Sequence, residues 1–82
     1  MNIRLFIKPG CPWCHEAIDW LAEQGIEFQM LDVIRDPEAR REMLELTGQT
    51  KAPSIDVDGL ILADFGADEL EAWWKKNGWP VR

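Results

Sequence analysis

The two cysteines of this chain, Cys11 and Cys14, stand three positions apart with Pro12 and Trp13 between them. Residues three apart on a helix share one face, so the two sulfurs would lie within reach of a disulfide. Pro12 suits the first position of a helix, where its missing N–H would be unpaired anyway, and this places Cys11 at the N-cap. Unpaired backbone N–H groups and the helix dipole stabilise a thiolate there. The spacing therefore predicts a reversible dithiol.

Other uses of the same cysteines are open. Cys11 to His15 also fits the Cys-x-x-Cys-His pattern of c-type haem attachment. That use requires export and a second axial ligand, of which the sequence gives no sign, so His15 is expected on the surface. A zinc site would need further ligands, and His15 is the sole histidine, so we expect no bound metal. Inert buried cysteines, or an iron–sulfur cluster shared by two chains with external thiols, remain alternatives.

Length and charge limit the class of protein. A chain of 82 residues forms one domain, residues 1–82, and an apolar share of 46% is sufficient for a packed core. The net charge of −6 disfavours nucleic acid and anionic membrane as partners. No stretch approaches the roughly 20 apolar residues of a membrane span, and no signal peptide precedes the first strand. We therefore expect a cytoplasmic monomer.

Apolar periodicity and turn residues divide the chain into seven elements. Gly25 stands where a helix would end, and Asp36-Pro37 is an N-cap residue followed by a helix-opening proline. Asp58-Gly59 is a strong signal for the turn of a β-hairpin. The predicted elements are strands over residues 3–8 and 26–33, two short strands within 53–63, and helices over 12–24, 37–47 and 67–77.

The same periodicity assigns side chains to the core. Met30 alternates with polar neighbours in the second strand and is expected to point inward. Leu46 in the second helix and Trp73 in the third are expected to be buried as well. Trp20 is instead expected to be partly exposed and to mark a surface for a partner.

The predicted order of elements is β-α-β-α-β-β-α. Two strands that bracket a helix should be parallel with a right-handed crossover, and hairpin strands must be antiparallel. The sequence therefore predicts an α/β fold in which three helices flank a mixed four-stranded sheet. With the two cysteines at the first strand–helix junction, this is the minimal thioredoxin-like arrangement.

Over essentially its full length the chain resembles the glutaredoxins of the thioredoxin-like superfamily. The matching residues are Lys8 to Cys14, Asp32-Val33, Asp36 to Arg40, Thr47-Gly48, Ala52-Pro53 and Val57 to Gly59. The resemblance implies a thiol–disulfide oxidoreductase in which Cys11 is the nucleophile and Cys14 the resolving thiol. It also implies that Pro53 is a cis-proline facing the active site, and that backbone groups of Ala52 bind an extended thiol substrate.

The resemblance further implies glutathione as a co-substrate. Lys8 lies where the family places a basic side chain near the nucleophile and the substrate carboxylate. Gln49 and Lys51 occupy the loop that grips the glycine end of glutathione. Asp68 is the candidate to receive the γ-glutamyl ammonium, and Trp13 stands where tyrosine is more usual.

The chain departs from the family after the fourth predicted strand, where Ala63-Asp64-Phe65-Gly66 replaces a Gly-Gly pair. Those glycines let the backbone approach the γ-glutamyl end of glutathione, and Asp64 adds a like charge near an anionic ligand. Glutaredoxin-like redoxins that are reduced by thioredoxin reductase share this departure and have a phenylalanine nearby, as Phe65 is here. The expected partners are therefore disulfide-containing or glutathionylated proteins, with glutathione or thioredoxin reductase as the electron source.

Overall fold

A computed structural model describes residues 1–81 and confirms the predicted order of elements, β-α-β-α-β-β-α. The strands are β1 (Ile3–Ile7), β2 (Gln29–Asp32), β3 (Ser54–Val57) and β4 (Leu60–Ala63). The helices are α1 (Pro12–Glu23), α2 (Pro37–Thr47) and α3 (Ala67–Lys76). None of the helices within residues 1–81 is long and apolar enough to span a membrane.

The four strands form one mixed sheet in the order β2-β1-β3-β4. β1 runs parallel to β2 and antiparallel to β3, and β3 pairs with β4 as an antiparallel hairpin. The hairpin turns at Asp58 and Gly59, whose φ angles of 51° and 93° are left-handed, as the Asp-Gly signal predicts. The predicted fold class, a thioredoxin-like sheet with flanking helices, is confirmed.

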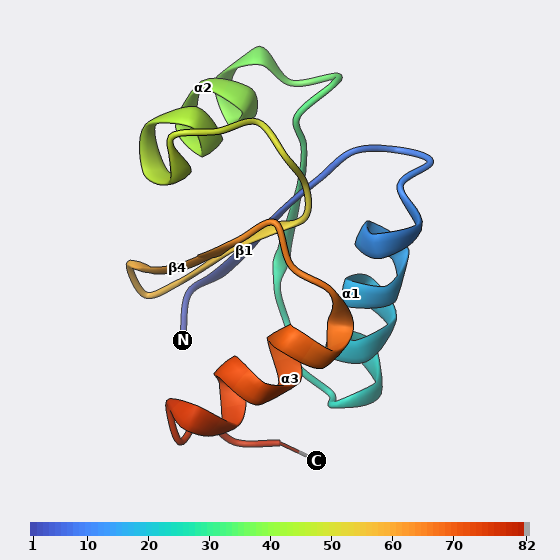
Figure 1. The fold of residues 1–82 in the computed structure, drawn as a ribbon, viewed down its shortest axis with the longest axis vertical. Coiled ribbons are helices and arrows are strands. Elements are labelled where there is room, and N and C mark those ends of the chain that lie inside the picture. The colour runs from blue at the N-terminus through green and yellow to red at the C-terminus, as the bar shows by residue number, and fades with distance from the viewer. Residues whose placement is uncertain (82) are drawn as a thin grey trace.

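The helices cover the sheet on both faces (Figure 1), with α1 and α3 on one side and α2 on the other. β1 serves both faces because its side chains alternate. Leu5 belongs to the larger core beneath α1 and α3, whereas Phe6 packs with Ala39 and Met43 of α2. A short turn over residues 8–11 carries the chain from the end of β1 to the start of α1.

Helix α2 begins and ends at the predicted residues. The Asp36 carboxylate accepts the backbone N–H groups of Glu38, at 3.0 Å, and Ala39, at 3.4 Å. At the other end Gly48 adopts a φ of 72°, and its N–H donates to the Leu44 carbonyl at 2.8 Å. These caps satisfy backbone groups that a helix leaves unpaired at its ends, which fixes where the following loop departs.

A charged network ties α2 to the sheet. The Arg4 guanidinium of β1 donates to the Asp56 carboxylate of β3 at 2.8 Å and to the Glu42 carboxylate of α2. The hydrogen bond that Arg4 donates to Asp56, and then the one that it donates to Glu42, raise the pKa of Arg4 above its usual value. The network holds α2 against the strands, and the loop over residues 48–53 runs from this helix back to the sheet.

Two tryptophans, Trp20 and Trp73, differ from their predicted burial. Trp20 is buried, and its ring meets Trp74 edge to face with centroids 5.8 Å apart. The predicted exposure of Trp20, and with it a partner surface there, is therefore wrong, because α3 packs over that face of α1. Trp73 is half-buried and stacks edge to face on Trp79 instead of entering the core fully.

Two aliphatic side chains expected in the core are exposed. Met30 lies on β2, the edge strand of the sheet, and β2 is shorter than the predicted residues 26–33. Leu46 lies in the last turn of α2. The buried residues of this helix are Ala39 and Met43, and Leu46 is exposed. Periodicity alone predicted neither outcome, because it does not show where an element runs past its covering partner.

Candidate active site

Cys11 occupies the N-cap of α1, as the sequence predicts. Its backbone is extended, with φ −87° and ψ 114°, and Pro12 takes the first helical position. The turn from β1 is closed by the Cys11 N–H, which donates to the Lys8 carbonyl at 3.3 Å, while Gly10 adopts a φ of 78°. The Cys11 sulfur accepts the backbone N–H of Cys14 at 3.3 Å. A helix-start N–H thus points at the sulfur, where it stabilises negative charge.

Cys14 lies beneath Cys11 and is almost completely buried, at 1% exposed. The pKa of the Cys14 thiol is raised to about 11, first by burial and second by the hydrogen bond with Cys11. A hydrogen bond to the Lys8 backbone and the charge of Lys8 act in the opposite direction. Both cysteines are free thiols in this structure. The two sulfurs differ in solvent access, because Cys14 is buried whereas Cys11 is only half-buried.

The loop before β3 lies beside Cys11. The Ala52–Pro53 peptide bond is cis, as predicted. The Ala52 carbonyl oxygen lies 4.0 Å from the Cys11 sulfur, and Pro53 is buried behind it. The Pro53 carbonyl accepts the backbone N–H of Asp64 at 3.0 Å, which joins this loop to the segment that follows β4.

The indole of Trp13 projects from the start of α1 and is 59% exposed. It borders two shallow hollows, of about 190 and 170 Å³. A Cβ added at Gly66 would lie 3.5 Å from the indole ring, an ordinary van der Waals contact, so the start of α3 lies close to Trp13 without requiring a glycine there. The first hollow is lined by Trp13, Ala52, Asp64, Phe65, Gly66 and Glu69, and the second by Trp13, Glu16, Gly66, Ala67, Asp68 and Glu69.

The structure brings most of the predicted site residues together. Trp13 and Ala52 share the first hollow, and Asp68 lines the second. Lys51 is exposed at the rim, with its ammonium 4.0 Å from the Asp64 carboxylate. Gln49 lines neither hollow within residues 1–81, and its backbone N–H and carbonyl are both hydrogen bonded to the Thr47 hydroxyl.

Sequence reasoning missed several residues of the hollows. Glu69 and Gly66 border both of them, and Glu16 lines the second. The Glu69 carboxylate accepts the Gly66 N–H at 3.4 Å, which is a capping interaction at the start of α3. The capping signal is visible in the sequence, but only the packing of α1 against α3 places it beside Trp13.

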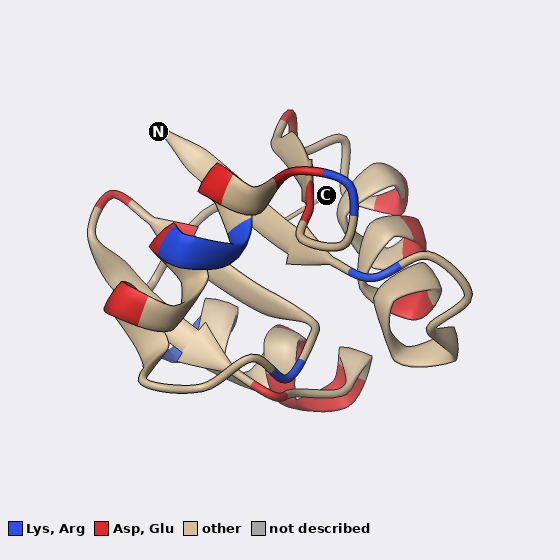
Figure 2. Ribbon diagram, turned by 90° about the horizontal axis from the view of Figure 1, so that it is seen from above, with Lys and Arg blue, Asp and Glu red and all other residues tan. Residues whose placement is uncertain are grey.

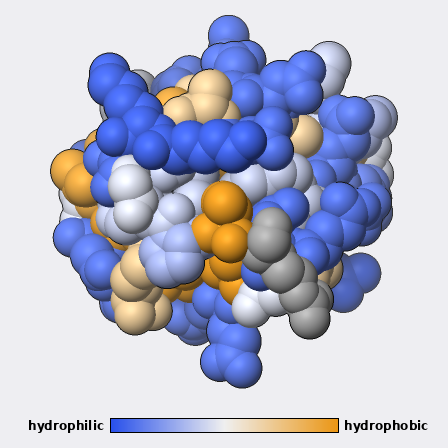
Figure 3. Space-filling view, turned by 90° about the horizontal axis from the view of Figure 1, so that it is seen from below, coloured by the Kyte–Doolittle hydropathy of each residue, from blue (hydrophilic) through white to orange (hydrophobic). Residues whose placement is uncertain are grey.

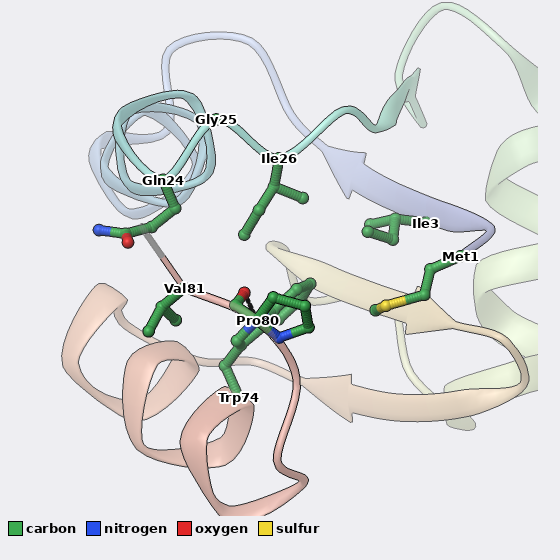
Figure 4. A pocket seen from close by; sticks show the side chains of 8 residues that line it. All are labelled: Met1, Ile3, Gln24, Gly25, Ile26, Trp74, Pro80 and Val81. Carbon is green, nitrogen blue, oxygen red and sulfur yellow. Dashed lines mark hydrogen bonds between the residues drawn. The ribbon is translucent and has the colours of Figure 1, made fainter.

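A separate apolar cavity of about 280 Å³ lies at the opposite end of β1 (Figure 4). Its walls are Met1, Ile3, Gln24, Gly25, Ile26, Trp74, Pro80 and Val81. The Trp74 indole N–H donates to the Pro80 carbonyl at 2.9 Å beside it. Figure 3 shows exposed apolar side chains in the middle of the face seen from below, surrounded by hydrophilic ones. This cavity contains neither cysteine, so it is no part of the dithiol site.

His15 is exposed, as predicted. Within residues 1–81 no group of three or more histidine, cysteine, aspartate or glutamate side chains has the arrangement of a metal site. The groups gathered at the site are the two sulfurs, the Ala52 backbone, the Trp13 ring and the charged side chains around it.

Comparison with known proteins agrees with this site. A sequence model described as Glutaredoxin matches residues 3–62. Glutaredoxin 3 of Escherichia coli K12 is 32% identical over 77 residues, which cover 94% of this chain and 90% of that protein. An uncharacterised glutaredoxin-like 8.6 kDa protein of the rubredoxin operon of Clostridium pasteurianum is 33% identical over 69 residues, covering 84% and 92%.

A solved structure gives the same result. The glutaredoxin-like protein NrdH-redoxin of Escherichia coli, described for its thioredoxin-like activity profile, superposes with a TM-score of 0.73 at 28% identity. The match covers 88% of this chain and 93% of that one. The paired cysteines at the first strand–helix junction, the matched residues and the shared fold agree, and the chain belongs to the glutaredoxin family of thioredoxin-fold redox proteins.

Proposed function

We propose that this protein reduces disulfides by a two-cysteine exchange in which Cys11 attacks and Cys14 resolves. The observation that carries the proposal is the unequal placement of the two sulfurs. Cys11 stands half-buried at the N-cap of α1 and accepts the Cys14 N–H at 3.3 Å, whereas Cys14 is buried beneath it. A substrate disulfide can approach the first sulfur, and the second is reserved for an intramolecular step.

The exchange has two steps that balance. The Cys11 thiolate attacks one sulfur of the substrate disulfide, so that a mixed disulfide forms and the other substrate sulfur leaves as a thiolate. Cys14 then loses its proton and attacks the Cys11 sulfur, which releases the second substrate thiolate. The substrate gains two electrons, and with two protons becomes a dithiol, while Cys11 and Cys14 become joined by a disulfide. An external thiol or dithiol donor must return those two electrons.

The order of the two steps follows from the Cys14 environment. Burial raises the pKa of the Cys14 thiol to about 11, so at neutral pH this sulfur is protonated and unreactive. The charge of Lys8 lowers that pKa relative to burial alone, so Lys8 supports the thiolate that Cys14 must form in the second step. Lys8 is thus proposed to assist resolution as well as to attract a substrate carboxylate.

We propose that the substrate binds in the first hollow. The Ala52 carbonyl lies 4.0 Å from the Cys11 sulfur, so an extended chain beside it could hydrogen bond to this backbone. The exposed Trp13 ring offers an apolar face on the other side of the hollow. We propose disulfide-containing or glutathionylated proteins as substrates, with Pro53 shaping the wall behind Ala52.

Two electron donors are proposed, each with its own support. Glutathione is favoured by the similarity to glutaredoxin 3 and by Lys8 and Lys51 as partners for its carboxylates. Gln49 and Asp68 would be its further contacts. Thioredoxin reductase is favoured by two observations. The Lys51 ammonium lies 4.0 Å from the Asp64 carboxylate, which competes with a glutathione carboxylate for that cation. The chain is also similar to NrdH-redoxin.

Coupled NADPH consumption tests the proposal. A peptide disulfide is offered with glutathione plus glutathione reductase, and separately with thioredoxin reductase alone. The wild-type protein should turn over with at least one donor, and Cys11→Ser should be inactive with both. Cys14→Ser should retain activity only on glutathionylated substrate. Circular dichroism of each variant controls for folding. Full activity of a folded Cys11→Ser protein would overturn the mechanism, and visible absorption after anaerobic purification would support the iron–sulfur alternative instead.

A further inference from the structure

We propose that Asp64 is a specificity-determining residue, which makes the site favour disulfides flanked by a cationic side chain over anionic ones such as oxidised glutathione. The proposal rests on the proposed function, because it concerns the substrate of the first hollow. This hollow is a groove lined by Trp13, Ala52, Asp64, Phe65, Gly66 and Glu69. The proposal is carried by the position of Asp64, which lines the same hollow as Trp13 and Ala52 and is hydrogen bonded to the Pro53 carbonyl.

The backbone fixes Asp64 at the wall of the groove. Its N–H donates to the Pro53 carbonyl at 3.0 Å, directly behind the Ala52 carbonyl that approaches Cys11. Its φ of 53° is left-handed, a conformation that aspartate tolerates better than most residues and glycine better still. A turn alone would therefore be served at least as well by glycine, and the carboxylate needs a separate explanation.

The Asp64 carboxylate engages the cation that a substrate carboxylate would need. Its oxygen lies 4.0 Å from the Lys51 ammonium. Because the side chains of Lys51 and Asp64 are 72% and 51% exposed, this ion pair contributes little to stability. Its consequence is electrostatic: an incoming carboxylate meets a partly neutralised lysine and a fixed like charge.

The remaining walls of the groove suit a cation. Glu69 lines the same hollow as Asp64, and the exposed Trp13 ring borders both hollows. A guanidinium or ammonium can stack on an indole face while it pairs with neighbouring carboxylates. No lysine or arginine is among the residues 1–81 that line either hollow. Figure 2 shows acidic residues on every side of the ribbon, in line with the net charge of −6.

Asp58 provides a matched control. It also has a left-handed φ, of 51°, and an exposed side chain. It lies in the β3–β4 turn, where its carboxylate accepts the Asn2 N–H at 2.7 Å, at the end of β1 that is remote from Cys11. Asp58→Asn and Asp64→Asn therefore remove the same charge from equivalent backbone conformations, one distant from the groove and one within it.

The experiment compares kcat/KM for two peptide disulfides that differ only in an arginine or a glutamate next to the cysteine. The donor is the one that supports turnover by the wild-type protein. The wild-type protein should prefer the arginine peptide. The ratio of kcat/KM for the arginine peptide to kcat/KM for the glutamate peptide should fall as salt is added. Asp64→Asn should lower the ratio about two- to fivefold, the range of one exposed charge pair, and should raise activity with oxidised glutathione. Asp58→Asn should leave the ratio unchanged.

The outcomes separate the two proposals. Active wild-type protein with an unchanged ratio in Asp64→Asn, or an equal change in Asp58→Asn, would overturn the role of Asp64 and leave the dithiol mechanism intact. Wild-type protein inactive on both peptides would overturn the proposed function. In that case the dissociation constants of the S-methylated peptides, measured by NMR, still test Asp64: equal binding of both peptides would refute the charge preference.

Discussion

At the scale of single residues, the site depends on how differently two chemically identical side chains are held. Cys11 is exposed to substrate at a helix start, and Cys14 is enclosed by the core, with a thiol pKa raised to about 11 by burial. A raised pKa means that folding favours the protonated thiol over the thiolate. Because the thiol has a pKa near 9 when unperturbed, this stability is complete below pH 9 and is lost between pH 9 and 11.

The first prediction is that reduced wild-type protein loses stability at alkaline pH through Cys14. Between pH 8 and 10.5 its free energy of unfolding should fall by about 2 kcal/mol more than that of Cys14→Ser, whose hydroxyl does not titrate there. Urea denaturation at both pH values measures the difference. Lysines titrate in both proteins and cancel in the comparison. An equal fall in the two proteins would contradict the raised pKa.

The residue scale also shows what the sequence could predict of the site. Cys11 and Cys14 at a helix start, and a cis bond before Pro53, follow from local patterns and the family resemblance, and the structure confirms their geometry. Asp64 was expected near the substrate from the family resemblance, whereas Gly66 and Glu69 as walls of the groove did not follow. Their place beside Trp13 depends on how α3 packs against α1, and no local spacing encodes that packing.

At the scale of elements, caps set where the helices begin and end, and thereby place the loops of the site. Asp36 caps α2 through the N–H groups of Glu38 and Ala39, and Gly48 ends it. These boundaries were predictable because capping residues act locally. The extent of β2 was not, because strand pairing decides it: the strand covers Gln29–Asp32 and leaves Met30 exposed at the sheet edge.

The second prediction concerns this cap. Asp36→Ala should lower the free energy of unfolding by about 1 kcal/mol, because two N–H groups lose their acceptor, while disulfide reduction at 25 °C stays near the wild-type rate. Asp36→Asn is the matched control, since its side-chain oxygen can still accept. Thermal melting and the peptide assay report the two effects. A loss of activity without a loss of stability would show that Asp36 acts at the site.

At the scale of the whole molecule, one sheet joins two cores. The larger core beneath α1 and α3 contains Trp20 and Trp74, and the smaller one beneath α2 contains Phe6 and Met43. None of the tryptophans belongs to the smaller core in the part of the chain that the structure describes. Tryptophan fluorescence therefore reports on the active-site face of the sheet, and a substitution on the α2 face tests whether the two faces unfold together.

The third prediction is that the two faces of the sheet unfold together. Met43→Ala removes a fully buried side chain and should lower the free energy of unfolding by about 3 kcal/mol. The fluorescence and far-UV circular dichroism transitions in urea should shift together, because β1 contributes to both cores. Leu44→Ala, at an exposed neighbour on α2, should change little. A circular dichroism shift with unmoved fluorescence would mean that the α2 face unfolds separately.

The central claim is that Cys11 is the attacking sulfur, and the rate of mixed-disulfide formation in the two single-cysteine variants tests it most directly. Each variant is mixed with the same peptide disulfide at pH 7, and intact mass is followed with time. Cys14→Ser should acquire one peptide adduct, on Cys11, while Cys11→Ser should remain unmodified over the same period because Cys14 is buried and protonated. Adduct formation in folded Cys11→Ser at the rate of Cys14→Ser would contradict the account.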